Sequence, residues 1–368
     1  MQSKKIKCVV WDLDHTIWNG ILLEDDTVTL REGIVEAIHE LDERGILLSI
    51  ASRNEAEPAL KRLKELGIRD YFIYPQIHWG SKAMSMKEIA SSINIGLDSI
   101  AFVDDQLFER EEVKSIHPEV WCLDPSSFPE VLSTPPMNPI FITSESKLRR
   151  QLYQTDQVRK QAEEHFLGTQ EEFLATLSMQ MHIASAGEED LQRAEELTVR
   201  THQLNTTGYT YSYEKLDLFR KSPNHRLWLT GLEDKYGTYG KVGLALLECS
   251  ETTWNIKLLL MSCRVMSRGV GSMFLNFIIR EAQEAGVELV AEYLPTNVNR
   301  MMYVAYTFAG FEPSTQEDGM VLFKHPYTNI QKFPEYVKLS VDIGKEQGDI
   351  GENCNAIFGT GYSIPGNV

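Results

Sequence analysis

The first 125 residues contain short apolar runs that are separated by amphipathic segments. Val9–Trp11, Ile46–Ala51 and Ile100–Val103 are continuous runs, a pattern typical of buried parallel strands. Residues 55–67 instead place apolar side chains at helical spacing, which predicts one amphipathic helix. Residues 19–30 are long enough only for a small hairpin. The pattern therefore predicts an α/β domain whose strands are joined by short segments, without a large inserted cap.

The second half shows a different order of elements. An apolar run at 256–261 predicts a strand, and the glycine turn Arg268-Gly269-Val270-Gly271 follows it. Residues 272–285 then predict a helix, 287–293 a strand and 299–309 another helix. Prolines cluster between 124 and 139, where we expect the linker, and residues 147–166 predict a charged helix.

Length and composition limit the classes of protein. The 368 residues exceed one typical domain, so we expect two. The predicted divisions are a first domain at 1–130, a linker with a helix at 131–165, a second domain at 166–327, and a tail or linker at 328–368.

The net charge of −17 argues against binding to nucleic acid. No apolar run is long enough to span a membrane, and no signal peptide precedes the first strand. The five cysteines show no metal-binding spacing. These features predict a cytoplasmic protein.

Polar and charged residues follow each apolar run of the first half. Asp12 and Asp14 come after the first run, and Asp104 and Asp105 come after the third. Paired carboxylates at strand ends suit a Mg²⁺-assisted phosphohydrolase. Candidates for holding phosphoryl oxygens follow the second run or stand alone further on, and are Ser52, Arg53, Asn54 and Lys82.

This set resembles the haloacid dehalogenase superfamily of phosphohydrolases. The resemblance implies that Asp12 is the nucleophile and Asp14 the general acid and base. It also implies that Ser52 and Lys82 bind the phosphoryl group. Mg²⁺ would be held by four carboxylates: Asp12, Asp14, Asp104 and Asp105.

The order of elements after residue 253 resembles GNAT-type acyltransferases, which implies an α+β fold for the second domain beside a Rossmann-like first domain. The resemblance implies that backbone N–H groups near Gly269 bind a pyrophosphate. Tyr306 matches the tyrosine that can protonate a departing thiolate. Met266 stands where such enzymes usually have Gln or Arg, so acetyl-CoA is not the assured donor.

Cys263 follows the predicted strand at 256–261 directly. Arg264 and Arg268 are close to it in sequence, and nearby cations lower a thiol pKa. We therefore interpret Cys263 as a candidate nucleophile. The alternative is that Cys263 is a small buried apolar residue, as lone cysteines usually are.

The two halves together resemble the FkbH-like family of glyceryl transferases of polyketide pathways, over nearly the whole chain to about residue 325. The matching strings include Val10–Asp14, Phe102–Gln106, Arg200–Asn205 and Ser262–Val265. The resemblance implies transfer of the three-carbon unit of 1,3-bisphosphoglycerate to the phosphopantetheine thiol of an acyl carrier protein, with loss of phosphate. Substrate-binding residues would include Arg264, Arg268, Gly269 and Asn205.

Two other functions remain open from the sequence. One is a small-molecule phosphatase fused to an acetyl-CoA-dependent N-acyltransferase. The other is a catalytically silent scaffold that binds a carrier protein. Basic residues that would dock an acidic carrier are Lys147, Arg149 and Arg150, or Lys257 with Arg264 and Arg268.

Overall fold

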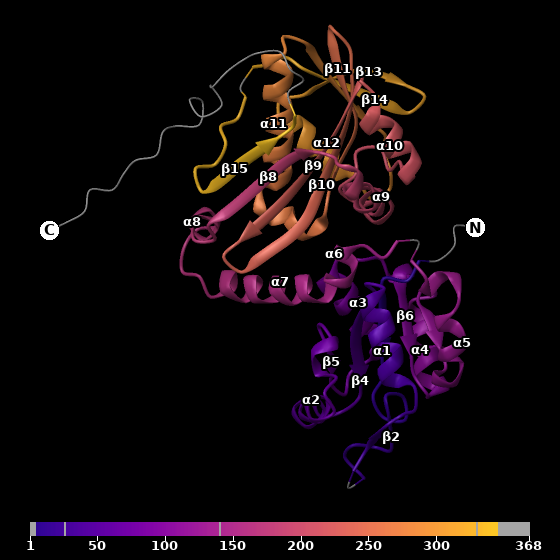
Figure 1. Ribbon diagram of the computed structural model, residues 1–368. Helices are drawn as coiled ribbons and strands as arrows, with labels where there is room; N and C mark the ends of the chain where they lie inside the picture. Colours follow the sequence, from indigo (N-terminus) through magenta and orange to yellow (C-terminus); the bar gives the residue numbers. More distant parts are fainter. Residues whose placement is uncertain (1–4, 26, 140, 329, 345–368) are drawn as a thin grey trace, which may run out of the picture.

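The computed structural model describes residues 5–25, 27–139, 141–328 and 330–344. The chain forms two domains stacked end to end, with helix α7 (Arg149–Glu164) lying between them (Figure 1). The first domain has the predicted Rossmann-like α/β fold, and the second has the predicted α+β fold.

A five-stranded parallel sheet is the centre of the first domain. Its strand order is β5-β4-β1-β6-β7. The strands are β1 (Cys8–Trp11), β4 (Leu47–Ser52), β5 (Gln76–Ile77), β6 (Ile100–Val103) and β7 (Trp121–Leu123). β1 is entirely buried, with β4 and β6 on either side in parallel register. This burial on both faces explains why these strands read as continuous apolar runs.

Four main helices cover this sheet: α1 (Ile34–Glu43), α2 (Ala56–Glu65), α3 (Lys82–Ile93) and α4 (Leu107–Ile116). α2 confirms the helix predicted over 55–67, and it buries Ala59 and Leu63. The strands β2 (Trp18–Asn19) and β3 (Thr29–Leu30) form the expected small hairpin. The described residues between these elements contain no cap domain.

The proline-rich segment is part of the first domain rather than a linker. It forms the short helix α5 (Phe128–Leu132) flanked by two 3₁₀ turns. Phe128, Leu132 and Met137 are buried in the core of the first domain. The predicted linker from residue 131 therefore starts too early, because apolar residues among the prolines fold back onto the sheet. The helices α6 (Ser144–Lys147) and α7 make the connection.

An eight-stranded sheet forms the second domain, in the order β13-β14-β12-β11-β10-β9-β8-β15. The strands are β8 (Met179–Ser185), β9 (His225–Asp234), β10 (Gly237–Cys249), β11 (Thr253–Met261), β12 (Glu288–Tyr293), β13 (Glu312–Glu317), β14 (Met320–His325) and β15 (Val337–Asp342). The helices are α8 (Gln170–Ala175), α9 (Leu191–Arg200), α10 (Tyr213–Lys221), α11 (Val270–Glu284) and α12 (Arg300–Phe308). The strands and helices predicted after residue 253 are thus present.

Strand β15 lies in the segment that we predicted as a tail from residue 328. It pairs in parallel with β8 from Val337 to Asp342 and extends the edge of the sheet. Its sequence alternates apolar and polar residues over only six positions, and of these only Val337 is buried, so the strand does not stand out in the sequence. The remainder of the predicted tail, 345–368, lies outside the described residues.

The parallel strands β11 and β12 pair only from Thr253 to Ile256 on β11 and from Glu288 to Ala291 on β12. Beyond that point a short piece of the chain, Leu204–Thr206, lies against β11. The N–H of Thr206 donates to the carbonyl of Leu259, and the N–H of Met261 donates to the carbonyl of Leu204. The N–H of Leu294, just after β12, donates to the carbonyl of Thr206. The gap between the two strands is therefore filled by the chain itself.

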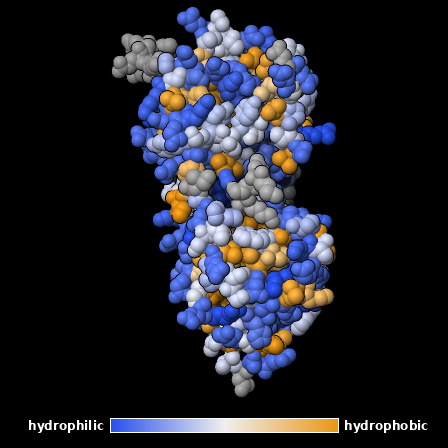
Figure 2. Space-filling view, turned by 90° about the vertical axis from the view of Figure 1, so that its right-hand side faces the viewer, coloured by the Kyte–Doolittle hydropathy of each residue, from blue (hydrophilic) through white to orange (hydrophobic). Residues whose placement is uncertain are grey.

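The two domains have separate hydrophobic cores. In the space-filling view the molecule has two lobes joined by a narrower waist, with apolar residues exposed on both (Figure 2). None of the described helices is both long and apolar enough to cross a bilayer.

Candidate functional site

The polar residues predicted at the strand ends meet at one edge of the first sheet. Asp12 follows β1, Ser52 ends β4, and Asp104 follows β6, and these three strands are neighbours. Parallel strands bring their carboxyl ends to the same edge, so residues far apart in sequence converge there. Lys82 joins them because it is the first residue of α3, which Ser81 caps.

Lys82 links two of the carboxylates. Its Nζ lies 2.9 Å from Oδ1 of Asp12 and 2.5 Å from Oδ2 of Asp104, and all three side chains are buried. Burial raises the pKa of Asp12 to about 7, because desolvation outweighs the opposing charge of Lys82. Burial likewise raises the pKa of Asp104. One lysine thus sits between two buried acids whose charges it only partly offsets.

Asp14 is held by three donors. Its Oδ1 accepts hydrogen bonds from Nε1 of Trp18 at 2.7 Å and from the N–H of Leu22 at 3.1 Å. Its Oδ2 accepts from Nδ2 of Asn54 at 3.0 Å. Trp18 belongs to the hairpin β2–β3, so the hairpin orients this carboxylate.

A cation could be held by Asp12, Asp104 and Asp105. Each offers a carboxylate oxygen, and these atoms lie within 4.8 Å of one another. An oxygen-only donor set suits a hard cation such as Mg²⁺. Asp14, the fourth predicted ligand, does not belong to this group, because its oxygens bond to the hairpin and to Asn54.

The phosphate-binding candidates at the end of β4 have different partners. Ser52 is buried beside Asp12. Asn54 bonds to Asp14 and also accepts a hydrogen bond from the N–H of Glu55. Arg53 forms ion pairs with two acids of α4, Glu109 at 3.1 Å and Glu112 at 3.3 Å. Ser52 and Lys82 therefore remain the candidates nearest to Asp12.

Residues 11–114 match the haloacid dehalogenase-like hydrolase family. Among solved structures, the chain is similar to the N-terminal part of a Bacteroides fragilis protein containing a phosphatase domain, complexed with Mg, at 31% identity and a TM-score of 0.32. That similarity covers 36% of this chain, which spans only 40% of the length of the Bacteroides fragilis chain. A comparison with curated proteins finds no match.

Acetyltransferases are also among the similar structures. The Escherichia coli ribosomal-protein-S18-alanine N-acetyltransferase is 17% identical over 42% of this chain and 97% of its own, with a TM-score of 0.32. A GNAT-family acetyltransferase from Streptococcus pneumoniae is 18% identical over 39% of this chain and 97% of its own, also with a TM-score of 0.32. We call the second domain the GNAT-like domain because it contains the order of elements predicted after residue 253.

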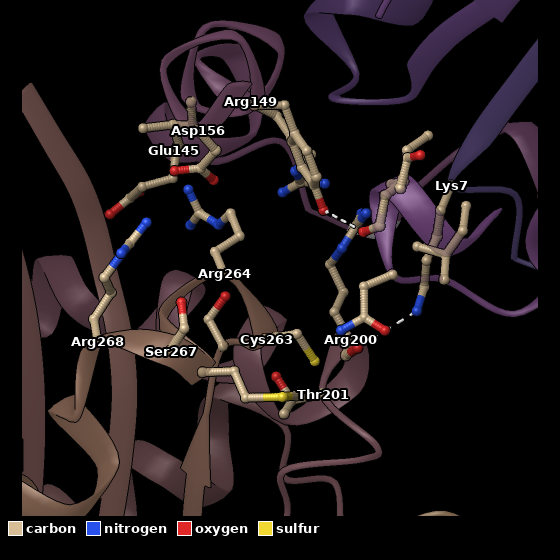
Figure 3. A pocket seen from close by; sticks show the side chains of 18 of the residues that line it. Lys7, Glu145, Arg149, Asp156, Arg200, Thr201, Cys263, Arg264, Ser267 and Arg268 are labelled. Atoms are coloured by element: carbon tan, nitrogen blue, oxygen red, sulfur yellow. Dashed lines mark hydrogen bonds between the residues drawn. The ribbon is translucent and has the colours of Figure 1, made fainter. Parts of the chain in front are cut away.

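A second candidate site lies between the hydrolase domain and the GNAT-like domain. It is a cavity of about 430 Å³. Lys7 and residues 92–95 line it from the hydrolase domain, α7 forms one wall, and Arg200 with residues 262–264 lines it from the GNAT-like domain (Figure 3). We call it the interdomain cavity.

Cys263 lines the interdomain cavity, and Figure 3 shows its sulfur pointing to the side where Arg200 and Thr201 lie. The prediction of a lowered thiol pKa is wrong for this structure. Burial raises the pKa of Cys263, and the cation that opposes this effect is Lys7 from the other domain. A six-residue 3₁₀ helix, Cys263–Arg268, also separates the thiol from the start of α11.

The other residues predicted around Cys263 divide into two groups. Arg264 and Arg268 line the interdomain cavity, but Arg268 is already paired with Glu163 of α7 at 2.9 Å. Gly269 is the residue before α11, with a φ of +73° that favours glycine, and it is not among the cavity-lining residues.

Asn205 and Tyr306 are not brought to the cavity. The Asn205 amide is fully buried, and it accepts hydrogen bonds from the N–H groups of Thr207 and Gly208. It therefore organises its own loop, and its role in substrate binding stays a prediction. Tyr306 is buried against Phe311 and Phe323, and burial raises the pKa of its phenol well above the usual range.

Several basic residues of the cavity were missed as site residues. Arg149, predicted as a carrier-docking residue, pairs with buried Glu196 and donates to the carbonyl of Gly45, so it joins the two domains. Arg150 pairs with Asp42 at 2.9 Å. Lys7 and Arg200 carry no local motif. Arg200 lies in the string Arg200–Asn205, which is one of the strings that carry the family resemblance.

Proposed function

We propose that the protein transfers the glyceryl unit of 1,3-bisphosphoglycerate to the phosphopantetheine thiol of an acyl carrier protein and removes the remaining phosphate. The observation that carries this proposal is the thiol of Cys263 in a cation-rich cavity, on the same chain as a complete aspartate site. A donor with two phosphates and an activated carbonyl needs both kinds of site.

Acyl transfer belongs to the interdomain cavity. The Cys263 thiolate attacks C1 of the donor, the bond from C1 to the phosphate oxygen breaks, and inorganic phosphate leaves with the bonding electrons. The carrier thiol then attacks the thioester and releases Cys263. Burial raises the Cys263 pKa, and the positive charge of Lys7, which lines the same cavity, opposes that rise and stabilises the thiolate that remains when the thiol proton leaves to water.

Hydrolysis of the C3 phosphate belongs to the aspartate site. Asp12 attacks phosphorus, and Asp14 protonates the departing sugar-acid oxygen before activating water against the aspartyl phosphate. Lys82 neutralises charge on the phosphoryl group. Mg²⁺ held by Asp12, Asp104 and Asp105 would stabilise negative charge on the phosphoryl oxygens. Monoester hydrolysis is among the slowest uncatalysed reactions, which explains the need for a dedicated site.

The two steps are separated in space. Lys7 precedes β1 and lines the cavity, whereas Asp12 follows β1 at the opposite edge of the sheet. The five residue steps from Lys7 to Asp12 span about 17 Å in an extended chain. One bound substrate therefore cannot occupy both sites at once. We propose that the carrier loads a phosphoglyceryl group at the cavity and then presents its C3 phosphate to Asp12 on the flexible phosphopantetheine arm.

The filled gap between β11 and β12 favours this proposal over an acetyl-CoA-dependent N-acyltransferase. The N–H groups of Leu259 and Met261 could otherwise pair with an amide-bearing ligand such as coenzyme A. They donate instead to Thr206 and Leu204. A silent scaffold is disfavoured because Asp12, Lys82 and Asp104 are assembled within hydrogen-bonding distance.

The test is the intact mass of a phosphopantetheinylated carrier protein after incubation with this protein, Mg²⁺ and enzymatically generated 1,3-bisphosphoglycerate. We expect a phosphoglyceryl adduct that is converted to a glyceryl adduct with time. Binding of coenzyme A without any carrier adduct would contradict the proposal and favour the acyltransferase alternative.

Two variants separate the steps in the same assay. Cys263→Ala should form no covalent acyl-enzyme and should load the carrier at least about 10³-fold more slowly, because the nucleophile is lost. Asp14→Asn should load the carrier but accumulate the phosphoglyceryl adduct. A covalent acyl-enzyme in the Cys263→Ala protein would show that another residue is the nucleophile.

A further inference from the structure

The interdomain cavity carries far more positive than negative charge, although the chain has a net charge of −17. Seven of its lining residues are basic and three are acidic. The basic residues are Lys7, Arg149, Lys160, Arg193, Arg200, Arg264 and Arg268. Such a local excess in an acidic protein indicates a site for an anion.

Internal ion pairs account for only part of this charge. Arg149 and Arg193 share one acid, Glu196, which lies behind the cavity wall. Arg268 is matched by Glu163. Asp156, another acid of the cavity, is paired with Arg159 at 2.7 Å. Arg264 also points toward Asp156 (Figure 3).

Among the described arginines that line the cavity, two form no ion pair: Arg200 and Arg264. Nη1 of Arg264 is buried and makes no hydrogen bond within the described part of the chain. Burial lowers the pKa of Arg200 to about 9 and that of Arg264 to about 10, and neighbouring arginines add to the effect. Glu196 near Arg200 and Asp156 near Arg264 offset part of this effect, but both acids are ion-paired with other arginines, so an anionic ligand would stabilise these two groups further.

Their position relative to the thiol defines the ligand. Arg264 adjoins Cys263 on the side of Asp156, and Arg200 lies on the side to which the sulfur points (Figure 3). Lys7 and Thr201 line the same cavity. A small ligand held by both arginines would therefore place its middle atoms beside the sulfur.

We propose that the interdomain cavity binds a small organic phosphate through Arg200 and Arg264, one on each side of Cys263. This inference rests on the proposed function for the identity of the donor. It adds that the donor has an anionic group on each side of the carbon that Cys263 attacks. An acyl phosphate with a second phosphate at its other end meets this requirement, and 3-phosphoglycerate, whose carboxylate replaces the acyl phosphate, is its unreactive analogue.

Protection of Cys263 from alkylation tests the proposal on the full-length protein. The rate of carbamidomethylation by iodoacetamide is measured by peptide mass spectrometry with inorganic phosphate, 3-phosphoglycerate or coenzyme A present. At roughly ten times its dissociation constant, 3-phosphoglycerate should slow the reaction about tenfold by mass action. Ligand bound at Asp12 cannot shield the thiol, because β1 separates the two sites.

Arginine variants identify the anchors. Arg200→Gln and Arg264→Gln should each weaken protection about 10- to 100-fold, the effect of losing a charge-assisted hydrogen bond. Lys324→Gln is the matched control, since Lys324 pairs with Glu288 on the surface of the same domain and should leave protection unchanged. Arg264→Lys should restore part of the protection.

Thermal unfolding without ligand distinguishes binding from a structural role. Removing an unmatched buried charge should leave the melting temperature unchanged or raise it, whereas a structural arginine would lower it. Absence of protection by 3-phosphoglycerate in the unmodified protein, or protection by coenzyme A alone, would overturn the proposal. Carrier loading without such protection would overturn this anion site and leave the proposed function standing. Protection of Cys263 by 3-phosphoglycerate without carrier loading would contradict the proposed function and leave the anion site standing.

Discussion

The two candidate sites are built from opposite charges. At the edge of the hydrolase sheet, carboxylates surround one lysine, and the geometry is fixed by short hydrogen bonds within one domain. In the interdomain cavity, arginines outnumber acids, and two domains and α7 each supply part of the wall. An acidic site recruits a cation and a basic site recruits an anion. This difference is what the proposed function requires, because a doubly phosphorylated donor would meet a cation-binding site for hydrolysis and an anion-binding site for transfer.

Removal of the nucleophile should give the largest effect and should act at one site only. Asp12→Asn is expected to lower phosphate release from a phosphate monoester by about 10⁴-fold or more, because the aspartyl phosphate cannot form. The measurement is release of p-nitrophenol from p-nitrophenyl phosphate in Mg²⁺. Alkylation of Cys263 in the same protein should be unchanged, and a parallel loss there would show that the sites are coupled.

Weakening the contact between α7 and the GNAT-like domain should lower the stability of that domain and leave hydrolysis at the aspartate site unchanged. Arg159 is buried, contacts Asp234 with two hydrogen bonds of 2.9 Å, and stacks on Tyr239. Arg159→Met leaves Asp234 buried without its partner, so the GNAT-like domain should lose about 3 kcal/mol of stability in urea unfolding. Lys114→Met, which removes an exposed pair with Glu111, is the control. Equal loss of monoester hydrolysis at temperatures where both proteins are folded would contradict the separation.

The hairpin should matter only to hydrolysis. Trp18→Phe keeps the packing but removes the Nε1 donor to Asp14, while Leu22 and Asn54 still hold that carboxylate. We expect kcat for monoester hydrolysis to fall about three- to tenfold, with little change in KM. Steady-state kinetics with p-nitrophenyl phosphate would check this. A change confined to KM would mean that the hairpin binds substrate instead of orienting Asp14.

The smallest effect concerns the pH dependence of Cys263. Lys7 is charged below its pKa of about 8, and there it favours the thiolate. Lys7→Met should slow alkylation about three- to tenfold below pH 8. Above pH 8 the lysine of the unmodified protein is itself neutral, so the two rates should converge. A constant ratio from pH 6 to pH 10 would show that Lys7 acts by shape and not by charge.

The aspartate site could be predicted because each of its residues stands beside a recognisable local sequence pattern and because the sheet that gathers them is regular. Asp12, Lys82 and Asp104 each follow a recognisable apolar run or cap, and parallel strands must bring their ends to one edge. The sequence could not show which partner each polar side chain of this site bonds to. Asp14 and Asn54 bond to each other, and Arg53 turns to the acids of α4, because those partners lie in other elements.

The interdomain cavity could not be predicted in the same way. Lys7, Arg149, Arg200 and Arg264 come from four separate parts of the chain, and each alone looks like a solvated basic residue. Helix α7 is polar on nearly all sides, a pattern shared by exposed helices and by helices that bridge domains. The prolines of 124–139 misled for a related reason, since turn residues mark a linker and a packed loop alike.

The segment Leu204–Thr206 has a consequence for how tightly the cavity can bind. By filling the gap between β11 and β12, it ties the chain just after Arg200 and Thr201 into the sheet on both sides. Arg200 is therefore attached between the end of α9 and a hydrogen-bonded strand segment, with little backbone freedom to lose when a ligand arrives. A mobile loop would lose conformational entropy when a ligand binds. Here that entropy is already lost during folding. Affinity in this cavity should depend on its charges, and the free and occupied backbones should be nearly superimposable.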